Sequence, residues 1–370
     1  MNPMDKKINV LHLVTSLNIG GTEKYLLSVS RTLKDKFNFQ VGYLKQEGPI
    51  AEELRKEGIP VYSLNNFFKL YRFLRKNKIH LLHTHLYRAN ILGRVAGAVT
   101  KTPVVICSQR SIDDWKKNRH ILADRWTAGL ADVIIANSQA IKSLLVEREK
   151  IPADKIEVVY NGVDTAGYVP RQTPEVLKAA LKIDSITPVI GYIGRLHREK
   201  GADFIPEIAS RLKRYVNNFK ILMIGDGPLE EELKRNIEKR GLVKDITLIS
   251  TKQNILDFIY LMDVVILPSR EESFPQVILE AMKMAKPVVV SDVGGVKEIV
   301  TNGVNGIVVH RDDLEIFTQA IYHLLKDRNK ALAMGQAGKE HVRRNFPLEK
   351  MIRETESIYN KFIDKKVFKY

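Results

Sequence analysis

The chain has 370 residues, of which 44% are hydrophobic and 28% are charged, and its formal net charge is +16. This composition is ordinary for a folded globular chain of about two domains and excludes disordered and collagen-like proteins. The single cysteine, Cys107, excludes an internal disulfide and a cysteine-based zinc site, and it suits a reducing compartment.

The N-terminal apolar run at residues 8–14 follows two lysines, as the core of a signal peptide would. It is short, contains Asn9 and His12, and is not followed by a cleavage site of small residues. No apolar run elsewhere reaches the roughly 18 residues that a membrane span needs. We therefore interpret this run as a buried first strand and expect a cytoplasmic protein.

Short runs rich in Val, Ile and Leu alternate with helical patterns along the first half of the chain. The predicted strands lie at residues 8–17, 39–44, 61–64, 80–85, 104–108, 133–137 and 156–160, with helices between most of them, such as 23–36 and 50–57. Near-continuous apolar strands followed by helices are typical of parallel sheets covered on both faces.

The pattern begins again in the second half, after a proline-containing segment at 164–188 that we interpret as a linker. Strands are predicted at 188–193, 220–224, 246–249, 264–267, 287–291 and 306–309, and the last helices at about 313–327, 330–344 and 348–364. Two consecutive sets of this kind predict an α/β protein with two doubly wound, Rossmann-like parallel-sheet domains.

Ligands of open parallel sheets bind beyond the carboxyl ends of the strands, and polar motifs follow several predicted strands here. Gly20-Gly21 follows the first strand and precedes a helix, so its backbone N–H groups suit a phosphate or a sugar, although a plain tight turn explains it equally well. Arg195 and Lys200 follow the first strand of the second half and form a pair of cations that suits a diphosphate; the alternative is a basic surface loop.

Two carboxylates, Glu272 and Glu280, follow the strand at 264–267. Pro275 between them suits a first helical turn, which predicts Glu272 in the loop and Glu280 about one turn into the helix. Each carboxylate can accept hydrogen bonds from sugar or ribose hydroxyls, and the helix start can face a phosphate. The alternative for Glu280 is an exposed helical residue.

His83 and His85 end the fourth strand and lie on one face of it. The sequence shows no clear third metal ligand, so we expect a polar contact with a ligand and no metal.

A basic aromatic helix is predicted near 67–78, and two interpretations of it remain: contact with an anionic membrane surface, or an ordinary amphipathic helix with Leu70, Phe73 and Leu74 in the core. Nucleic acid is not expected as a partner, because zinc-finger spacing and aromatic RNA-binding signatures are absent from the sequence.

Taken in order, these motifs resemble those of the retaining glycosyltransferases of family 4 (group 1), which have the GT-B fold of two Rossmann-like domains facing a central cleft. The resemblance spans almost the whole chain. It rests on residues 18–23, His83-Thr84-His85, Asn161-Gly162-Val163-Asp164, residues 191–195 with Lys200-Gly201, residues 225–228, residues 267–269, Glu272 with Glu280, and Gly294-Gly295 with Glu298.

The resemblance implies an enzyme that moves a hexose or hexosamine from a nucleotide diphosphate sugar, such as a UDP- or GDP-sugar, to an acceptor hydroxyl with retention of configuration. It implies no metal or other cofactor. The acceptor would be a glycan or a lipid-linked sugar in surface polysaccharide or glycolipid synthesis, at the inner face of the membrane, and a small soluble acceptor is the alternative. The implied domains are an acceptor-side domain at 1–170, joined by a returning helix at about 350–370, and a donor-binding domain at 171–349.

The resemblance also implies roles for individual residues. Arg195 and Lys200 would bind the diphosphate, Glu272 the sugar hydroxyls and Glu280 the ribose. The remaining contacts would come from Gly20 and Gly21 to the diphosphate, from the backbone amides of Ser273, Phe274 and Gln276, from His85 beside the reacting carbon, and from the segment Thr251–Gln253 to the base.

The chain departs from the family pattern at two places. Ser273-Phe274-Pro275 replaces the common Gly-Phe-Gly, and Pro275 removes one backbone N–H. Residues 108–111, with Arg110, replace a histidine-containing loop, and we interpret Arg110 as a contact to acceptor or phosphate. Two alternatives stay open: a nucleotide-sugar 2-epimerase of the same fold, and a non-enzymatic module that binds polyanions.

Overall fold

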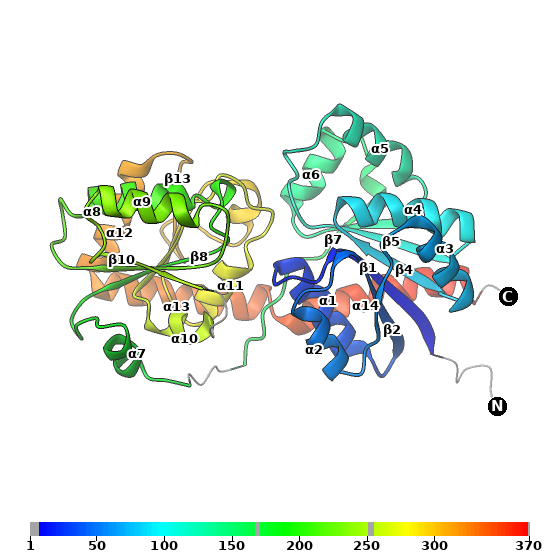
Figure 1. Cartoon of the computed structure of the whole chain (residues 1–370), viewed down its shortest axis with the longest axis horizontal. Coiled ribbons are helices and arrows are strands. Elements are labelled where there is room, and N and C mark those ends of the chain that lie inside the picture. The colour runs from blue at the N-terminus through cyan, green and yellow to red at the C-terminus, as the bar shows by residue number, and fades with distance from the viewer. Residues whose placement is uncertain (1–6, 167–170, 251–254, 369–370) are drawn as a thin grey trace. The chain divides into compact units, whose positions relative to one another are not determined.

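The computed structural model describes residues 7–166, 171–250 and 255–368, and its contacts divide the chain into two units. Unit 1 consists of Met1–Asn161 and Glu349–Tyr370, and unit 2 consists of Gly162–Leu348. Each unit contains one parallel sheet with helices on both of its faces (Figure 1). The predicted fold class, two doubly wound parallel sheets, is confirmed.

The sheet of unit 1 has seven strands in the order β3-β2-β1-β4-β5-β6-β7. All of their pairings are parallel, as their continuous apolar sequences predict. The strands are β1 (Ile8–Ser16), β2 (Phe37–Gln46), β3 (Val61–Ser63), β4 (Leu81–His85), β5 (Val104–Gln109), β6 (Val133–Ala136) and β7 (Ile156–Val158).

The helices of unit 1 cover both faces of this sheet. They are α1 (Gly21–Leu33), α2 (Ile50–Lys56), α3 (Phe67–Lys76), α4 (Tyr87–Thr100), α5 (Asn118–Ala128), α6 (Gln139–Glu147) and the returning C-terminal helix α14 (Leu348–Lys366). Helices α1, α2 and α14 lie on one face, and α3, α4 and α5 lie side by side on the other (Figure 1).

Unit 2 has six parallel strands in the order β10-β9-β8-β11-β12-β13. They are β8 (Val189–Ile193), β9 (Lys220–Ile224), β10 (Ile246–Ile249), β11 (Val264–Leu267), β12 (Val288–Ser291) and β13 (Ile307–Val309). Its helices are α7 (Pro174–Ala180), α8 (Ile205–Leu212), α9 (Glu230–Lys239), α10 (Ile255–Leu261), α11 (Gln276–Lys283), α12 (Leu314–Lys326) and α13 (Arg328–Asn345).

The largest core of unit 2 lies between its sheet and α8, α9 and α12. Fully buried side chains such as Ile190, Met223, Ile208 and Ile321 meet there. Burying one such side chain contributes about 1.5–3 kcal/mol to the free energy of unfolding. This packing holds the strands rigidly, so the loops at their carboxyl ends have a fixed base.

Several helix starts follow from single polar residues. The side chains of Asn66, Ser138, Asp313 and Asp327 each accept a hydrogen bond from the backbone N–H three residues further on. Each such cap satisfies one of the N–H groups that a helix leaves without a partner at its start, and it is worth about 1 kcal/mol.

The chain enters and leaves unit 2 along two adjacent segments. Val163 pairs with Pro347 in a parallel bridge, its N–H donates to the carbonyl of Phe346, and the N–H of Leu348 donates back to its carbonyl. A side chain at Gly162 would collide with the backbone of Leu348, so this close approach requires glycine. Because of this pairing the division between the units falls after Asn161, nine residues earlier than the sequence-based boundary, and the predicted linker contains α7.

Candidate functional site

In each unit the predicted site residues lie where the strand order reverses. In unit 1 the reversal is between β1 and β4, and Gly20 and Gly21 follow β1 while His85 ends β4. In unit 2 it is between β8 and β11, and Arg195 and Lys200 follow β8 while Glu272 follows β11. The crevice outside the carboxyl ends of the strands at such a point is the usual ligand site of a doubly wound sheet.

The two loops of unit 2 are held against each other by the backbone. Gly201 has φ 65°, and a side chain there would collide with the carbonyl of Pro268, so only glycine fits. The N–H of Arg270 donates to the carbonyl of Glu199, and its guanidinium forms two hydrogen bonds to the carboxylate of Asp203 at 2.7 and 2.8 Å. The loop after β8 and the loop after β11 therefore form one rigid site.

Lys200 and Glu272 meet at the centre of this site. The Lys200 Nζ lies 2.8 Å from Oε1 of Glu272, and the hydroxyl of Ser269 donates to the same oxygen at 2.9 Å. The Glu272 side chain is 6% exposed and that of Lys200 is 24% exposed. The N–H of Gly295 donates to the Glu272 carbonyl, so the carboxylate is fixed through its backbone as well. The structure therefore brings together these two of the residues that the sequence predicts to share a site.

Arg195 lies at the rim of the same site. Its side chain is 66% exposed and forms an ion pair with Glu199 at 3.1 Å. The hydroxyl of buried Tyr192, on β8, donates to the Arg195 carbonyl at 2.8 Å. Burial raises the pKa of Tyr192, the charges of Glu272 and Asp203 raise it further, and Arg195 lowers it. Arg195 and Glu272 thus both lie close enough to Tyr192 to act on it electrostatically.

The acidic motif continues into α11 as predicted, with one shift. Pro275 is the N-cap residue, without a side-chain cap, and the helix begins at Gln276. Glu280 lies one turn into α11 and is half-buried, so it is not the fully exposed residue of the alternative interpretation. The Phe274 ring is buried against the ring of Phe346. Ser273 and Phe274 both belong to the loop that precedes α11. The Gln276 side chain donates to the Gly162 carbonyl at 3.1 Å.

In unit 1, Gly20 and Gly21 mark the start of α1. Gly20 is the N-cap residue without a side-chain cap, and a side chain there would meet the Glu23 carboxylate. Around Gly21 there is open space for a side chain. The start of α1 therefore presents backbone N–H groups beside the end of β1, and a helix start of this kind favours an anion.

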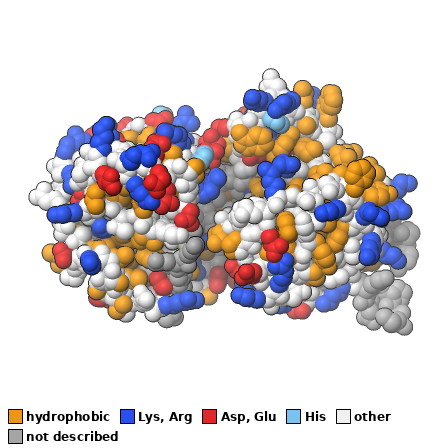
Figure 2. Space-filling model, viewed as in Figure 1, with side chains coloured by type: hydrophobic (Ala, Val, Ile, Leu, Met, Phe, Trp, Pro, Cys, Tyr) orange, Lys and Arg blue, Asp and Glu red, His pale blue; other side chains and the backbone are white. Residues whose placement is uncertain are grey.

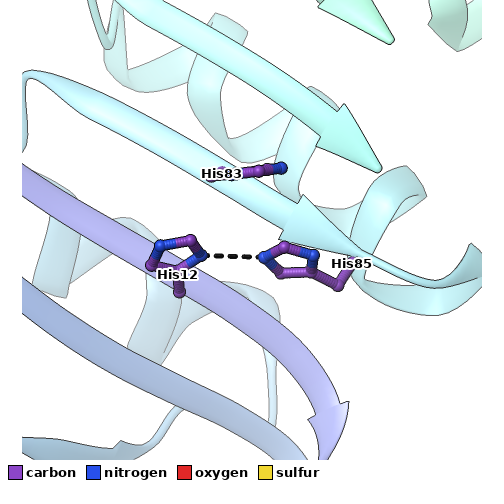
Figure 3. Close-up of side chains that lie close together, drawn as sticks. All are labelled: His12, His83 and His85. Carbon is purple, nitrogen blue, oxygen red and sulfur yellow. Dashed lines mark hydrogen bonds between the residues drawn. The ribbon is translucent and has the colours of Figure 1, made fainter. Parts of the chain in front are cut away.

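His85 belongs to a cluster of three buried histidines, His12, His83 and His85, which Figure 3 shows together. His12 Nδ1 and His85 Nε2 lie 2.8 Å apart. Burial lowers the pKa of His12 to about 3, and burial together with neighbouring positive charge lowers those of His83 and His85 well below 6.5. All three imidazoles are therefore neutral at neutral pH.

Sequence reasoning missed the third imidazole of this cluster. His12 lies in β1 and pairs in register with His83 of β4. The signal was present, because a histidine interrupts the apolar run of the first strand, but only the strand pairing shows which residue it faces. The three side chains lie close enough together to hold a metal ion. The prediction of no metal from the sequence rested on the lack of a clear third ligand, and that reason was wrong, since His12 is a third candidate ligand.

Arg110 follows β5 and is buried. Its guanidinium stacks on the Tyr25 ring at 3.6 Å from the ring centre and donates to the side chain of Asn161. Burial lowers its pKa to about 10, while Tyr25 and Glu23 act in the opposite direction. Arg110 thus stacks on Tyr25, whose ring lies in an edge arrangement with that of His85 at 5.9 Å between ring centres. The predicted base-binding segment, Thr251–Gln253, lies outside the described residues.

Comparison with protein families identifies the class of protein that this fold and site belong to. Residues 19–166 match the model of glycosyltransferase family 4, and residues 174–341 match that of the glycosyl transferases group 1. Together the two matches span most of both units. The chain belongs to the group 1, family 4 glycosyltransferases, and its fold is GT-B.

Individual relatives agree with this assignment. An Escherichia coli protein named UDP-Gal:alpha-D-GlcNAc-diphosphoundecaprenol alpha-1,3-galactosyltransferase is 25% identical over 89% of this chain and 90% of its own length. The Staphylococcus aureus capsular polysaccharide biosynthesis glycosyltransferase CapM is 25% identical over 83% and 84%. The crystal structure of Anabaena HepE with UDP-glucose covers 96% of this chain and all of its own, with 22% identity and a TM-score of 0.87.

Proposed function

We propose that the protein transfers a hexose or hexosamine from a nucleotide diphosphate sugar to a hydroxyl group of a glycan or a lipid-linked sugar, with retention of configuration, in surface polysaccharide or glycolipid synthesis. The observation that carries the donor class is the site after β8 and β11, where Arg195, Lys200 and Glu272 are held by one rigid pair of loops. The names of the relatives from E. coli and S. aureus, a diphosphoundecaprenol galactosyltransferase and a capsular polysaccharide glycosyltransferase, support the acceptor class.

The chemistry of unit 2 suits a leaving diphosphate. Negative charge grows on the diphosphate as the bond to the sugar breaks, and Arg195 and Lys200 are fixed cations beside it. Pro275 leaves the first N–H groups of α11 without a side-chain cap, so the positive end of this helix can face the same phosphates. We propose that these groups stabilise the leaving group without a metal ion.

The carboxylates then hold the sugars. Glu272 is oriented by Lys200 and Ser269 and accepts hydrogen bonds from hydroxyls of the donor sugar, while Glu280 binds the ribose. The backbone amides of Ser273, Phe274 and Gln276 line the donor site. In unit 1, Gly20 and Gly21 contact the diphosphate and His85 lies beside the reacting carbon. Transfer on one face of the sugar requires a donor phosphate oxygen to take the acceptor proton, and no side-chain nucleophile is then needed.

We also propose an anionic membrane surface as a partner of unit 1. In α3, Leu70 and Leu74 are buried, as the amphipathic interpretation predicts, and Phe73 is partly buried against the same core. Phe68 is 75% exposed. The exposed basic residues of this helix, none of which forms an ion pair within the described ranges, are Lys69, Arg72, Arg75 and Lys76.

The neighbouring helices extend this surface. Trp126 of α5 is 78% exposed and Trp115, just before that helix, is 53% exposed. Figure 2 shows hydrophobic and basic side chains next to one another over the part of unit 1 that carries α3, α4 and α5. Aromatic rings beside lysine and arginine are typical of surfaces that bind the membrane interface. Among the described residues there is no helix with the length and hydropathy of a membrane span.

The donor is tested by a thermal-shift and product screen across UDP- and GDP-sugars, with EDTA or with added Mg²⁺. We expect one nucleotide sugar to raise the melting temperature, and EDTA to leave transfer unchanged.

Product analysis separates the alternative functions, because a 2-epimerase releases free nucleotide without an acceptor. A polyanion-binding module would instead bind any polyanion in a salt-dependent way, unaffected by Glu272→Ala or Glu280→Ala. Absence of binding and turnover with every nucleotide sugar would contradict the proposal.

A further inference from the structure

Five side chains of unit 1 form a continuous buried chain of hydrogen bonds. Ser108 Oγ lies 2.8 Å from His83 Nε2, His83 Nδ1 lies 2.6 Å from the Tyr359 hydroxyl, and that hydroxyl lies 3.4 Å from His12 Nε2. The chain continues over 2.8 Å from His12 Nδ1 to His85 Nε2. All five side chains are fully buried.

Four elements bring these residues together. In the parallel register, His12 of β1 lies opposite His83 of β4, and His85 of β4 lies opposite Ser108 of β5. The helix α14 covers this face of the sheet and supplies Tyr359 from the far end of the sequence (Figure 1). The arrangement thus depends on the return of the C-terminal segment to unit 1.

The distances favour hydrogen bonding over a shared metal ion. Two imidazole nitrogens bound to one tetrahedral zinc, each at about 2.0–2.1 Å, are about 3.3 Å apart. The observed separation of 2.8 Å between His12 and His85 is that of a hydrogen bond (Figure 3). Moreover, both ring nitrogens of His83 already lie within hydrogen-bond distance of hydroxyl groups.

The direction of the chain follows from its two ends. A neutral imidazole has one N–H donor and one acceptor nitrogen, so the direction of one hydrogen bond sets all the others. If Ser108 accepts, its own hydroxyl proton has no acceptor in the described structure, and His85 Nδ1 is left as a bare acceptor. If Ser108 donates, every proton in the chain is used except the one on His85 Nδ1. Because each buried unsatisfied group costs about 1–3 kcal/mol, the second direction is favoured.

In this direction all three histidines carry their proton on Nδ1. Ser108 donates to His83, His83 Nδ1–H donates to Tyr359, Tyr359 donates to His12 Nε2, and His12 Nδ1–H donates to His85 Nε2. The chain then ends at the Nδ1–H of His85. This nitrogen is buried and has no hydrogen-bond partner in the described structure, so it requires an oxygen from a ligand.

The backbone after His85 points to a ligand as well. Leu86 has φ 70° and ψ 156°, a conformation that is costly for any residue with a side chain. Strain of this kind costs about 1–3 kcal/mol and is concentrated at functional sites. Leu86 is also the N-cap residue of α4 and provides no side-chain cap. The open end of the hydrogen-bond chain therefore lies at a strained turn from strand to helix.

We propose that Tyr359 and His12 are positioning residues that fix His85 as the Nδ1–H tautomer, and that this N–H donates to an oxygen of the bound sugar. The identity of the ligand rests on the proposed function, whereas the hydrogen-bond chain does not. His85 acts in this scheme as a neutral donor, and no proton is transferred. The C-terminal helix thereby contributes to catalysis without contacting substrate.

The chain is tested first in the free protein, by ¹⁵N NMR of the labelled histidine side chains. We expect His12, His83 and His85 to be neutral, with the proton on Nδ1 in each. Tyr359→Phe, which removes only the hydroxyl, should give mixed tautomers at His12 and His85. Thr355→Val, which removes another buried hydroxyl from the same face of α14, is the matched control and should leave all three unchanged. Nε2–H tautomers in the wild type would contradict the proposed direction of the hydrogen bonds. About one zinc ion per polypeptide after purification without chelator would show that the histidines bind a metal instead.

The positioning role is tested by turnover with the donor found in the nucleotide-sugar screen. Tyr359→Phe should lower kcat about three- to tenfold, the worth of one hydrogen bond, with the donor KM unchanged. His85→Asn places an amide N–H close to the position of Nδ1–H and should retain more activity than His85→Gln, whose N–H replaces Nε2. An unchanged kcat in Tyr359→Phe with altered tautomers would overturn the positioning role alone. If no donor is found, the NMR result still decides whether the chain exists.

Discussion

Lys200 Nζ and Glu272 Oε1 lie 2.8 Å apart, although the two residues follow different strands of the sheet of unit 2. The carboxylate is almost completely buried and has Ser269 as its second partner. A buried carboxylate of this kind depends on its cation, since removing one partner of a buried pair leaves an uncompensated charge. The site is therefore already charged and rigid before any donor binds.

The first prediction concerns the cations of this site. Lys200→Ala and Arg195→Ala should each lower the rate of transfer on the order of 10²-fold, because each removes positive charge from the leaving diphosphate. Arg198→Ala is the matched control. Arg198 belongs to the same loop but pairs with Glu232 at 2.8 Å, so its loss should change the rate by less than about twofold. Initial rates with the donor from the screen measure these effects. Near-normal turnover in both Lys200→Ala and Arg195→Ala would exclude stabilisation of the leaving diphosphate by these two cations.

Much of the fold could be predicted because its strands are local, continuous apolar runs. The bounds of β9, β10 and β11 agree with the predicted ranges, and most other strands differ only by one or two residues at an end. The strand order could not be predicted in this way, because pairing joins distant segments. For the same reason the sequence showed His83 and His85 together but did not connect them with His12 or with Tyr359.

The candidate site was more predictable in unit 2 than in unit 1. Arg195, Lys200 and Glu272 are close to strand ends in the sequence, so the general rule for parallel sheets was enough to place them. The pairing of Val163 with Pro347 depends on the returning chain and moved the boundary between the units to Asn161. Family resemblance supplied the roles, and the distances within the site came only from the structure.

A second prediction concerns the buried ionic cluster around Asp124 of α5. Asp124 lies 2.7 Å from the guanidinium of Arg94 and 2.6 Å from the ammonium of Lys116, and all three side chains are at most 3% exposed. Asp124→Asn should lower the free energy of unfolding by about 3–5 kcal/mol, because the buried guanidinium of Arg94 is left without a carboxylate partner among the described residues, whereas Lys116 keeps Glu149 at 3.0 Å. Urea denaturation followed by circular dichroism measures this loss.

The control for this change is Glu340→Gln. Glu340 pairs with Arg343 at 2.8 Å on the surface of α13, and both side chains are partly exposed. A surface pair is worth about 0–1 kcal/mol, so the control should be nearly neutral. Equal losses in the two variants would show that burial of the cluster around Asp124 does not matter for stability.

A third prediction follows from the buried histidines. Their pKa values are lowered from 6.5, that of His12 to about 3, because burial disfavours the charged imidazole. The unfolded chain therefore binds protons below pH 6.5 that the folded chain does not, and stability falls as the pH falls through this range. Between pH 7.5 and pH 5.5, His12 should lower the free energy of unfolding by about 1.4 kcal/mol, and His83 and His85 should act in the same direction.

Urea denaturation at the two pH values tests this dependence. His12→Phe should remove the His12 share, about 1.4 kcal/mol, from the difference between the two pH values, and His310→Asn, at an exposed side chain, is the control. If the wild type has the same free energy of unfolding at pH 5.5 and at pH 7.5, the histidines are not buried in the neutral form.

The last prediction concerns the basic aromatic surface of α3. The double variant Lys69→Glu with Arg72→Glu should bind vesicles containing anionic lipid at least about 30-fold more weakly, because each basic residue near such a surface contributes about 1 kcal/mol. The matched control reverses two exposed basic residues of α9, Arg235→Glu with Lys239→Glu, and so changes the net charge by the same amount on unit 2. Co-sedimentation with vesicles, with and without anionic lipid, measures both. Equal weakening in the two variants would mean that net charge alone drives binding, and no binding by the wild type would exclude the membrane as a partner.

Phe68→Ser adds a test of the apolar contribution, since this ring is 75% exposed and its loss should weaken binding without any change of charge.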